Sequence, residues 1–333
     1  MGRDFFESHL SPGQFSGAIL LARKGQVVFE RYAGYRSRET GEQVTPETSF
    51  HLASVSKTFT GMAICKLWEE GKLQLDDLVS GYLEGFNYPG ITVKHLLNHR
   101  SGLPNYVHVL PETFLGTNLP VQNKDVLRFL IENRSRLGAG IPDRRFDYCN
   151  TNYALLALIV EKVSGLSFPD YLNQVFFKPI GMNNTFVCTS SSQQESFPSY
   201  TWRKQKEKFT FLDLIYGDKN IYSTVRDLLK WDSTLTYGSL FKPETLQAAY
   251  SGYSYERRGI KNYGLGWRLY IYPDNRKIVY HNGWWHGNNT VFARLIQDSA
   301  TVIILGNTFN RRIYQAPKLY AEIGAYEMDE SED

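Results

Sequence analysis

The stretch that decides the fold of this chain runs from residue 50 to residue 60 and reads Phe50-His51-Leu52-Ala53-Ser54-Val55-Ser56-Lys57-Thr58-Phe59-Thr60. From Val55 onward, apolar residues recur every three or four positions, which predicts a helix with one buried face. Gly71 stands where a left-handed residue would end that helix. Ser54 is therefore expected at the helix start, where unpaired backbone N–H groups and the helix dipole favour developing negative charge.

The spacing of Ser54 and Lys57 indicates nucleophilic chemistry. The two residues lie about one helical turn apart, so the lysine amine can approach the serine hydroxyl. A hydroxyl becomes a good nucleophile when a base takes its proton, and a lysine serves as that base when its surroundings favour the uncharged amine. Apolar residues flank Lys57 and supply such surroundings. The alternative is an incidental pair, since Ser-x-x-Lys occurs by chance about once in a chain of this length.

The composition is that of a globular protein with a sizeable core. Hydrophobic residues make up 42% and charged residues 21% of 333 residues, a length that fits two domains or one domain with an insertion. The net charge of +3 is too small to predict a nucleic-acid partner. No apolar run reaches the length of a membrane span. Aromatic residues, at 14%, exceed what a core needs and hint at an aromatic-lined cleft.

The cysteines and the first residues of the chain give information on the cellular compartment of the protein. Cys65, Cys149 and Cys188 are too scattered to predict a disulfide framework or a metal site. The start, Met1 to Phe6, does not combine a charged leader with an apolar stretch. We therefore expect either an extracytoplasmic protein, as in a bacterial periplasm, whose signal has been removed, or a cytoplasmic one.

The pattern along the chain predicts an α+β architecture. Residues 16–35 read as a β-hairpin with its turn at 23–25, and residues 72–90 as a connecting surface segment. Helices are expected at 91–99, 124–137, 150–163, 168–177, 224–235 and 315–325, and strands at 267–272, 277–280, 290–296 and 301–305, with a turn from 283 to 289. Residues 195–220 fit no element. We expect one domain over 1–333: an antiparallel sheet flanked by helices from about 1–75 and 220–333, with a mainly helical lobe inserted at about 76–219.

One of the expected helices invites a metal-binding interpretation. His95 and His99 are four residues apart, but Leu96 occupies the position at which zinc peptidases carry a glutamate. Thr92 is the expected N-cap of this helix. We therefore interpret both histidines as structural and predict no metal site.

Two further segments supply candidate partners for Ser54. Tyr148 and Asn150 stand just before an apolar helix, where a turn can project both side chains into a cleft; the alternative is that Asn150 caps that helix and Tyr148 packs. A phenol acts as a base at neutral pH only beside cations. His281 and Gly283 end a strand, where a backbone N–H can stabilise an oxyanion and glycine permits close approach. His281 can bind a substrate carboxylate, tune Lys57 and Tyr148, or be structural. Tyr280-His281-Asn282 repeats the Tyr-x-Asn pattern, so that pattern is not unique.

In this order, the three segments resemble the motifs of the serine β-lactamase-like and penicillin-binding protein family, especially its class C β-lactamase and D-alanyl-D-alanine carboxypeptidase branch. Ser54 to Lys57 matches Ser-x-x-Lys, Tyr148 to Asn150 matches Tyr-x-Asn, and His281 to Gly283 matches the Lys/His-x-Gly element. The flanks that share the resemblance are residues 45–60, 71–77, 91–104, 179–182 and 263–267.

The resemblance implies a five-stranded type of sheet and a helical lobe, with the active site between them. It implies acylation of Ser54 by an amide, ester or lactam carbonyl followed by hydrolysis, with Lys57 and Tyr148 sharing the acid and base work. It also implies an oxyanion hole of the Ser54 and Trp284 backbone N–H groups, substrate contacts from Asn150, His281, Gly283 and Trp284, and no metal or cofactor. The partner would be a small-molecule or peptide substrate, and the oligomeric state stays open.

Two departures bear on the substrate. Class C β-lactamases usually carry lysine where this chain has His281, whose charge would depend on pH. Trp284-Trp285 is bulkier than the small residues of many relatives, so the rings could narrow the pocket or stack on a substrate. The alternatives to a β-lactamase or peptidase are an esterase on the same fold and a penicillin-binding sensor that is acylated without efficient turnover.

Overall fold

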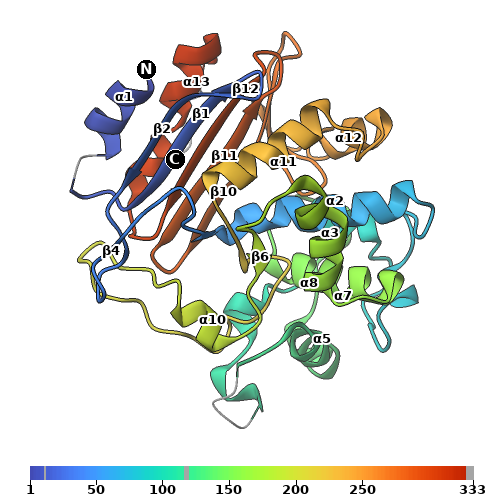
Figure 1. Ribbon diagram of the computed structural model, residues 1–333. Helices are drawn as coiled ribbons and strands as arrows, with labels where there is room; N and C mark the ends of the chain where they lie inside the picture. The colour runs from blue at the N-terminus through green and yellow to red at the C-terminus, as the bar shows by residue number, and fades with distance from the viewer. Residues whose placement is uncertain (11–12, 116–119, 328–333) are drawn as a thin grey trace.

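The computed structural model describes residues 1–10, 13–115 and 120–327, and a large antiparallel sheet lies at its centre (Figure 1). Within the described residues the sheet has seven strands in the order β2-β1-β12-β11-β10-β9-β8. The strands are β1 (Gly17–Arg23), β2 (Gln26–Ala33), β8 (Lys261–Tyr263), β9 (Arg268–Ile271), β10 (Lys277–Trp285), β11 (Asn288–Leu295) and β12 (Ala300–Gly306). Both ends of the chain contribute to one sheet, as predicted. The edge strands β2 and β8 extend it beyond the five strands that the resemblance implied.

Local turn chemistry sets the register of the first hairpin. Lys24 and Gly25 join β1 to β2 with φ values of 50° and 72°, the left-handed pair typical of a two-residue hairpin turn. β1 then pairs with β12, with Gly17 opposite Gly306 and Arg23 opposite Ala300. The first strand of the chain is thereby fixed beside the last.

Helices cover both faces of the sheet (Figure 1). On the outer face, α1 (Gly2–Phe5), the π-turn that follows it (Phe6–Leu10) and α13 (Pro317–Gly324) pack on one apolar cluster. On the inner face, α2 (Ser56–Glu69), α11 (Val225–Tyr237) and α12 (Pro243–Ala249) belong to the larger cluster, which continues into the helical region. α2 runs at the junction of the sheet and the helical region, so residues at its N-terminus face both.

The helical region surrounds α7 (Asn150–Ser164), which is buried along most of its length. The other helices of this region are α3 (Val93–Leu97), α4 (Tyr106–Val109), α5 (Asn123–Glu132), α6 (Arg134–Leu137), α8 (Phe168–Leu172), α9 (Lys178–Ile180) and α10 (Ser191–Glu195). The Thr92 hydroxyl accepts from the His95 N–H, which confirms the predicted cap of α3. The Asn150 helix ends at Gly165, at a φ of 72°. Two small sheets complete the fold: β3 (Tyr35–Ser37) with β4 (Glu42–Gln43), and β5 (Phe50–His51) with β7 (Ile221–Ser223) and β6 (Phe186–Val187).

The predicted connecting segment at 72–90 lies largely at the surface, but some of its side chains are anchored in the core. Leu73, Val79, Leu83 and Phe86 are buried and belong to the core of the helical region. The segment lacks a helical or strand period because its apolar side chains reach the core from successive turns.

The predicted turn at 283–289 is too long. β10 continues through Gly283 to Trp285, and the chain reverses at His286 and Gly287, with a φ of 50° at His286. The Asp213 carboxylate bonds to both Trp285 and His286 and holds this turn. A contact between residues about 70 positions apart leaves no local pattern in the sequence. Periodicity alone therefore did not reveal where β10 ends and where the chain turns.

No helix in the described ranges is long and apolar enough to cross a bilayer.

Candidate active site

Ser54 lies in a short 3-10 turn (Ala53–Val55) that leads directly into α2. The preceding Ala53 has a φ of 48°, a left-handed conformation that costs a residue with a Cβ on the order of 1–3 kcal/mol. Its N–H donates to His51 Nδ1 at 3.0 Å, so His51 Nε2–H donates to Asn220 Oδ1 at 2.9 Å. Burial lowers the pKa of His51 to about 4, so the ring is neutral and keeps this tautomer. His51 therefore links the backbone of the strained turn to the Asn220 side chain. These bonds hold the turn that carries the Ser54 hydroxyl.

Lys57 is fully buried, and its amine contacts three oxygen atoms. Its Nζ lies 3.1 Å from Ser54 Oγ, 2.8 Å from Asn150 Oδ1 and 2.8 Å from the Asp218 carbonyl oxygen. The structure thus brings Lys57 to the hydroxyl one turn away. Donation to the Asn150 amide oxygen and to the Asp218 carbonyl orients the nitrogen, so that its remaining position is directed at the serine oxygen.

Asn150 is the first residue of α7, yet its side chain does not cap that helix. Cys149 occupies the N-cap position and makes no side-chain cap bond, whereas Asn150 Oδ1 accepts from Lys57. This observation excludes the alternative in which Asn150 merely caps the helix.

Tyr148 lies at the wall of the site between two cations. Its half-buried ring centroid lies 5.0 Å from Lys57 Nζ and 5.0 Å from Arg268 Cζ. On another side the ring packs against His99, with centroids 4.3 Å apart. The Tyr148 ring therefore lies between two basic side chains, one of which is the partner of Ser54.

His281 is fully buried and belongs to a relay of hydrogen bonds. His99 Nδ1 accepts from the Cys149 N–H at 3.1 Å, so His99 Nε2–H donates to the Tyr263 hydroxyl at 3.2 Å. Tyr263 then donates to His281 Nε2 at 3.1 Å, and His281 Nδ1–H donates to the Asn282 carbonyl at 2.7 Å. Burial, with the charges of Arg268 and Lys57 adding to it, holds the pKa of His281 well below its usual value.

The idea of a pH-dependent cation at position 281 is therefore wrong. Both ring nitrogens of His281 are bonded within the protein, and the ring is neutral. It lies close to Tyr148, with ring centroids 6.2 Å apart, and so supports that wall of the site from behind.

Gly283 is where β10 meets the Ser54 turn. A Cβ at this position would lie 2.8 Å from Ser54 N, 2.5 Å from the Leu52 carbonyl and 2.4 Å from Thr290 Oγ1, distances that real side chains do not adopt. The absence of a Cβ lets the strand approach the serine backbone closely. The next residue, Trp284, has an indole that is 64% exposed and packs against Phe309.

Sequence reasoning missed three residues of this site. Arg268 directly follows the Tyr263–Trp267 motif and signalled no function by itself. Asp218 lies in the stretch 195–220 that fitted no element, and the role of His51 depends on the strain at Ala53. Contacts between segments that are far apart in the sequence position all three residues. The order of the three sequence motifs was therefore the only signal that could have identified them.

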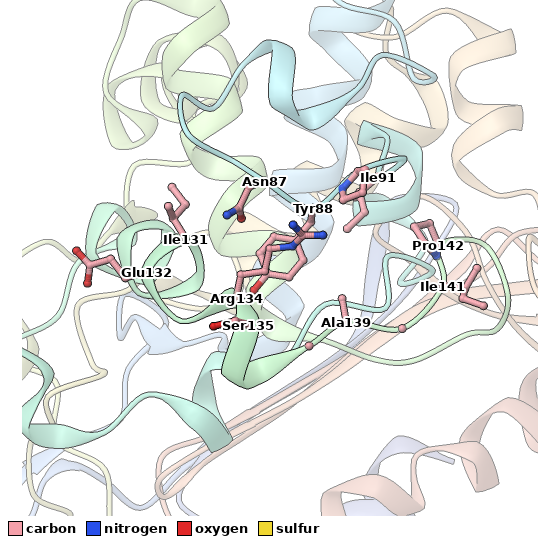
Figure 2. Close-up of a pocket in the computed structure, with 13 residues that line it drawn as sticks. Asn87, Tyr88, Ile91, Ile131, Glu132, Arg134, Ser135, Ala139, Ile141 and Pro142 are labelled. Atoms are coloured by element: carbon pink, nitrogen blue, oxygen red, sulfur yellow. The ribbon is translucent and has the colours of Figure 1, made fainter.

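Two neighbouring cavities flank the loop at 138–140. The larger, of about 640 Å³, lies in the helical region and is lined among others by Tyr88, Arg134 and Ile141 (Figure 2). The other, of about 450 Å³, includes Tyr148 and Cys149 in its lining. The smaller cavity is the better candidate for substrate because it holds a residue of the site.

The described residues contain no group of three or more His, Cys, Asp or Glu side chains able to hold a metal ion. Cys65, Cys149 and Cys188 are buried free thiols.

This geometry agrees with comparison against known proteins. The family model described as Beta-lactamase matches residues 4–324, and the chain belongs to this family.

Among curated proteins, penicillin-binding protein 4* of Bacillus subtilis is 32% identical over 318 residues, covering 91% of this chain and 70% of the relative. An octameric penicillin-binding protein homologue from Pyrococcus abyssi superposes with a TM-score of 0.80 at 26% identity, covering 96% of this chain and 75% of that one. A penicillin-binding protein from Bacillus halodurans superposes with a TM-score of 0.82 at 24% identity, covering 96% and 98% of the two chains.

Proposed function

We propose that this protein is a serine hydrolase that cleaves an amide, lactam or ester bond through an acyl-Ser54 intermediate. The observation that carries the proposal is the buried Lys57 amine, 3.1 Å from Ser54 Oγ and oriented by Asn150 and Asp218. In general base catalysis, a hydroxyl is activated as a nucleophile by a base beside it, and here the buried amine is directed at a hydroxyl on a strained turn. The match to the Beta-lactamase family supports the same reaction class.

The first half of the reaction forms the ester. Ser54 Oγ attacks the substrate carbonyl carbon while its proton passes to Lys57 Nζ, and the carbonyl oxygen becomes an oxyanion. The backbone N–H groups of Ser54 and Trp284, held together by the close approach of Gly283, stabilise that oxyanion. The bond to the leaving group then breaks, and Tyr148 delivers to the leaving group the proton that Lys57 took up.

The second half of the reaction releases the product. Water attacks the acyl ester, gives a proton to the same Lys57 and Tyr148 pair and displaces Ser54 Oγ, which regains its hydrogen. The free acid leaves, and the enzyme returns to its starting state.

Arg268 favours substrates with an anionic group next to the scissile bond. The groups that interact with its charge include the phenols of Tyr280, Tyr148 and Tyr263, and no carboxylate in the described part of the chain forms an ion pair with it. A half-buried guanidinium without a carboxylate partner is suited to a bidentate contact with a carboxylate. Peptides with a free C-terminal carboxylate and β-lactams carry such a group, so we propose them ahead of neutral esters.

The test is acylation followed by mass spectrometry. The protein is incubated with a fluorescent penicillin, with D-Ala-D-Ala peptides and with short esters, and its intact mass is followed over time. We expect an adduct on Ser54 that decays, and none in the Ser54→Ala variant, whose thermal unfolding should match that of the wild type. A persistent adduct would instead support a sensor acylated without turnover. No adduct with any acyl donor would refute the proposal.

A further inference from the structure

A hairpin in the stretch that fitted no predicted element projects from the protein beside β4 (Figure 1). Tyr200 is fully buried at its base and pairs with Lys206 across the hairpin. The tip is a tight turn in which the Thr201 N–H donates to the Gln205 carbonyl at 2.9 Å and Lys204 has a φ of 65°. Tyr200 also bonds through its backbone to Asn307 and Phe309, both at 2.8 Å. The hairpin is therefore anchored to the segment that follows β12.

Two exposed indoles and the half-buried ring of Phe309 lie along this anchorage. Trp202, at the tip, is 66% exposed, and it lines a hollow of about 360 Å³ together with Phe309. Trp284 is 64% exposed, and its ring centroid lies 5.6 Å from that of Phe309. Two indoles left two-thirds exposed and linked by a third ring indicate an interaction surface.

Basic side chains surround these rings. The hairpin carries Arg203, Lys204, Lys206 and Lys208, and Arg311 and Arg312 follow Phe309 after Asn310. The Arg203 guanidinium carbon lies 4.6 Å from the centroid of the Trp202 ring. The acidic residues nearby include Glu207, in the hairpin itself, and Glu39, which accepts from the Tyr200 hydroxyl at 2.6 Å. These two segments carry six basic residues against the acidic Glu207, Glu39 and Glu42, and Glu42 is paired with Arg36, so the aromatic-basic patch has a positive excess.

We propose that this aromatic-basic patch docks the protein on the surface of an anionic lipid bilayer. Indole rings settle at the boundary between headgroups and acyl chains, and lysine and arginine clusters are attracted to anionic headgroups. A soluble polyanion would satisfy the cations but leave the indoles in water, and a neutral saccharide would satisfy the indoles but not the cations. An anionic bilayer satisfies both. Because Trp284 borders Ser54, docking brings the candidate active site close to the membrane surface.

The experiment is co-sedimentation of the full chain with vesicles at low salt, which requires no enzymatic activity. We expect binding to vesicles of phosphatidylcholine with 30% phosphatidylglycerol and none to pure phosphatidylcholine. The Lys204→Gln/Lys208→Gln variant should bind about 25-fold more weakly, since each cation contributes roughly fivefold. Trp202→Ala should bind roughly tenfold more weakly.

Matched controls lie on other surfaces of the protein. Lys124→Gln/Lys162→Gln removes two exposed cations of the helical region, and Tyr255→Ala removes an aromatic residue that is 73% exposed; both should bind like the wild type. Absence of binding to anionic vesicles would overturn the proposal, as would equal binding by patch and control variants. Binding that inorganic polyphosphate abolishes and that Trp202→Ala leaves unchanged would point to a soluble polyanion and would overturn it too.

Discussion

Replacing Gly283 by alanine is the sharpest test of how β10 shapes the site. The new Cβ would lie 2.8 Å from Ser54 N and 2.5 Å from the Leu52 carbonyl, and both of these are backbone atoms that cannot rotate away. The strand must therefore move outward from the Ser54 turn by a few tenths of an ångström or more. That movement separates the N–H groups of Ser54 and Trp284, which we propose bind the oxyanion together.

The expected loss follows from the contribution of one oxyanion donor. Removing such a donor costs about 3 kcal/mol of transition-state stabilisation, or a factor of roughly 10²–10³ in the acylation rate. Overpacking at the same position should lower the free energy of unfolding by about 1–3 kcal/mol, which leaves a folded protein to assay. Substrate binding that does not depend on the oxyanion should change much less.

Stopped-flow acylation by a chromogenic acyl donor measures the rate, and urea unfolding measures the stability. Gly306→Ala is the matched control because it lies on β12 of the same sheet, where a Cβ meets its nearest atom at 3.4 Å. Acylation of Gly283→Ala within threefold of the wild-type rate, with unchanged stability, would refute the argument.

Three further predictions concern Lys57, Arg268 and His51. Lys57→Arg should lower acylation by at least roughly 10³ because guanidinium cannot give up its proton; single-turnover kinetics check this, and a rate near that of wild type would exclude Lys57 as the base. Arg268→Gln should reduce kcat/KM for substrates with a carboxylate by roughly 30- to 100-fold, the loss of about 2–3 kcal/mol from a charge-assisted contact, while a neutral ester of the same acyl group should change by less than threefold; equal losses for both would contradict the proposed carboxylate contact. Because the folded-state pKa of His51 is about 4 and its ordinary value is 6.5, its contribution to stability is complete above pH 6.5 and is lost as pH falls toward 4, by about 2 kcal/mol at pH 5. Urea unfolding of the wild type and of His51→Gln at pH 7 and pH 5 should show a smaller pH effect in the variant, and an equal effect would show that folding does not shift the pKa of His51.

Much of the fold was predictable because its signals are local. The helical signal of α2, the Thr92 cap and the turn at Lys24 and Gly25 each depend on residues a few positions apart, and the structure has all three. The prediction of a single buried face on α2 is wrong, because residues 56–65 are buried on every side of the helix. The meeting of Ser54 and Lys57 belongs to the same class, since helical geometry alone brings them together.

The rest of the site depends on contacts between distant segments. From the sequence alone, His281 is interpreted as a cation whose charge depends on pH. The structure shows that both ring nitrogens form hydrogen bonds, one with Tyr263 and one with the Asn282 carbonyl. In the same way, residues 283–285 are predicted as a loop from the sequence, whereas they belong to a strand that ends at residue 285. The Asp213 carboxylate holds the turn that follows this strand. Such bonds follow from the packed structure and leave no periodicity in the sequence.

The segment from 213 to 220 has a consequence for redesign of this protein. Asp213 holds the β10–β11 turn, the carbonyl of Asp218 orients Lys57, and Asn220 secures His51 beneath the strained residue Ala53. Grafting a foreign loop here to change selectivity would disturb the nucleophile, its base and the oxyanion strand in a single step. The neighbouring hairpin tip, by contrast, contributes no side chain to these contacts, so libraries that vary residues 202–205 can alter what the protein approaches while its chemistry stays intact.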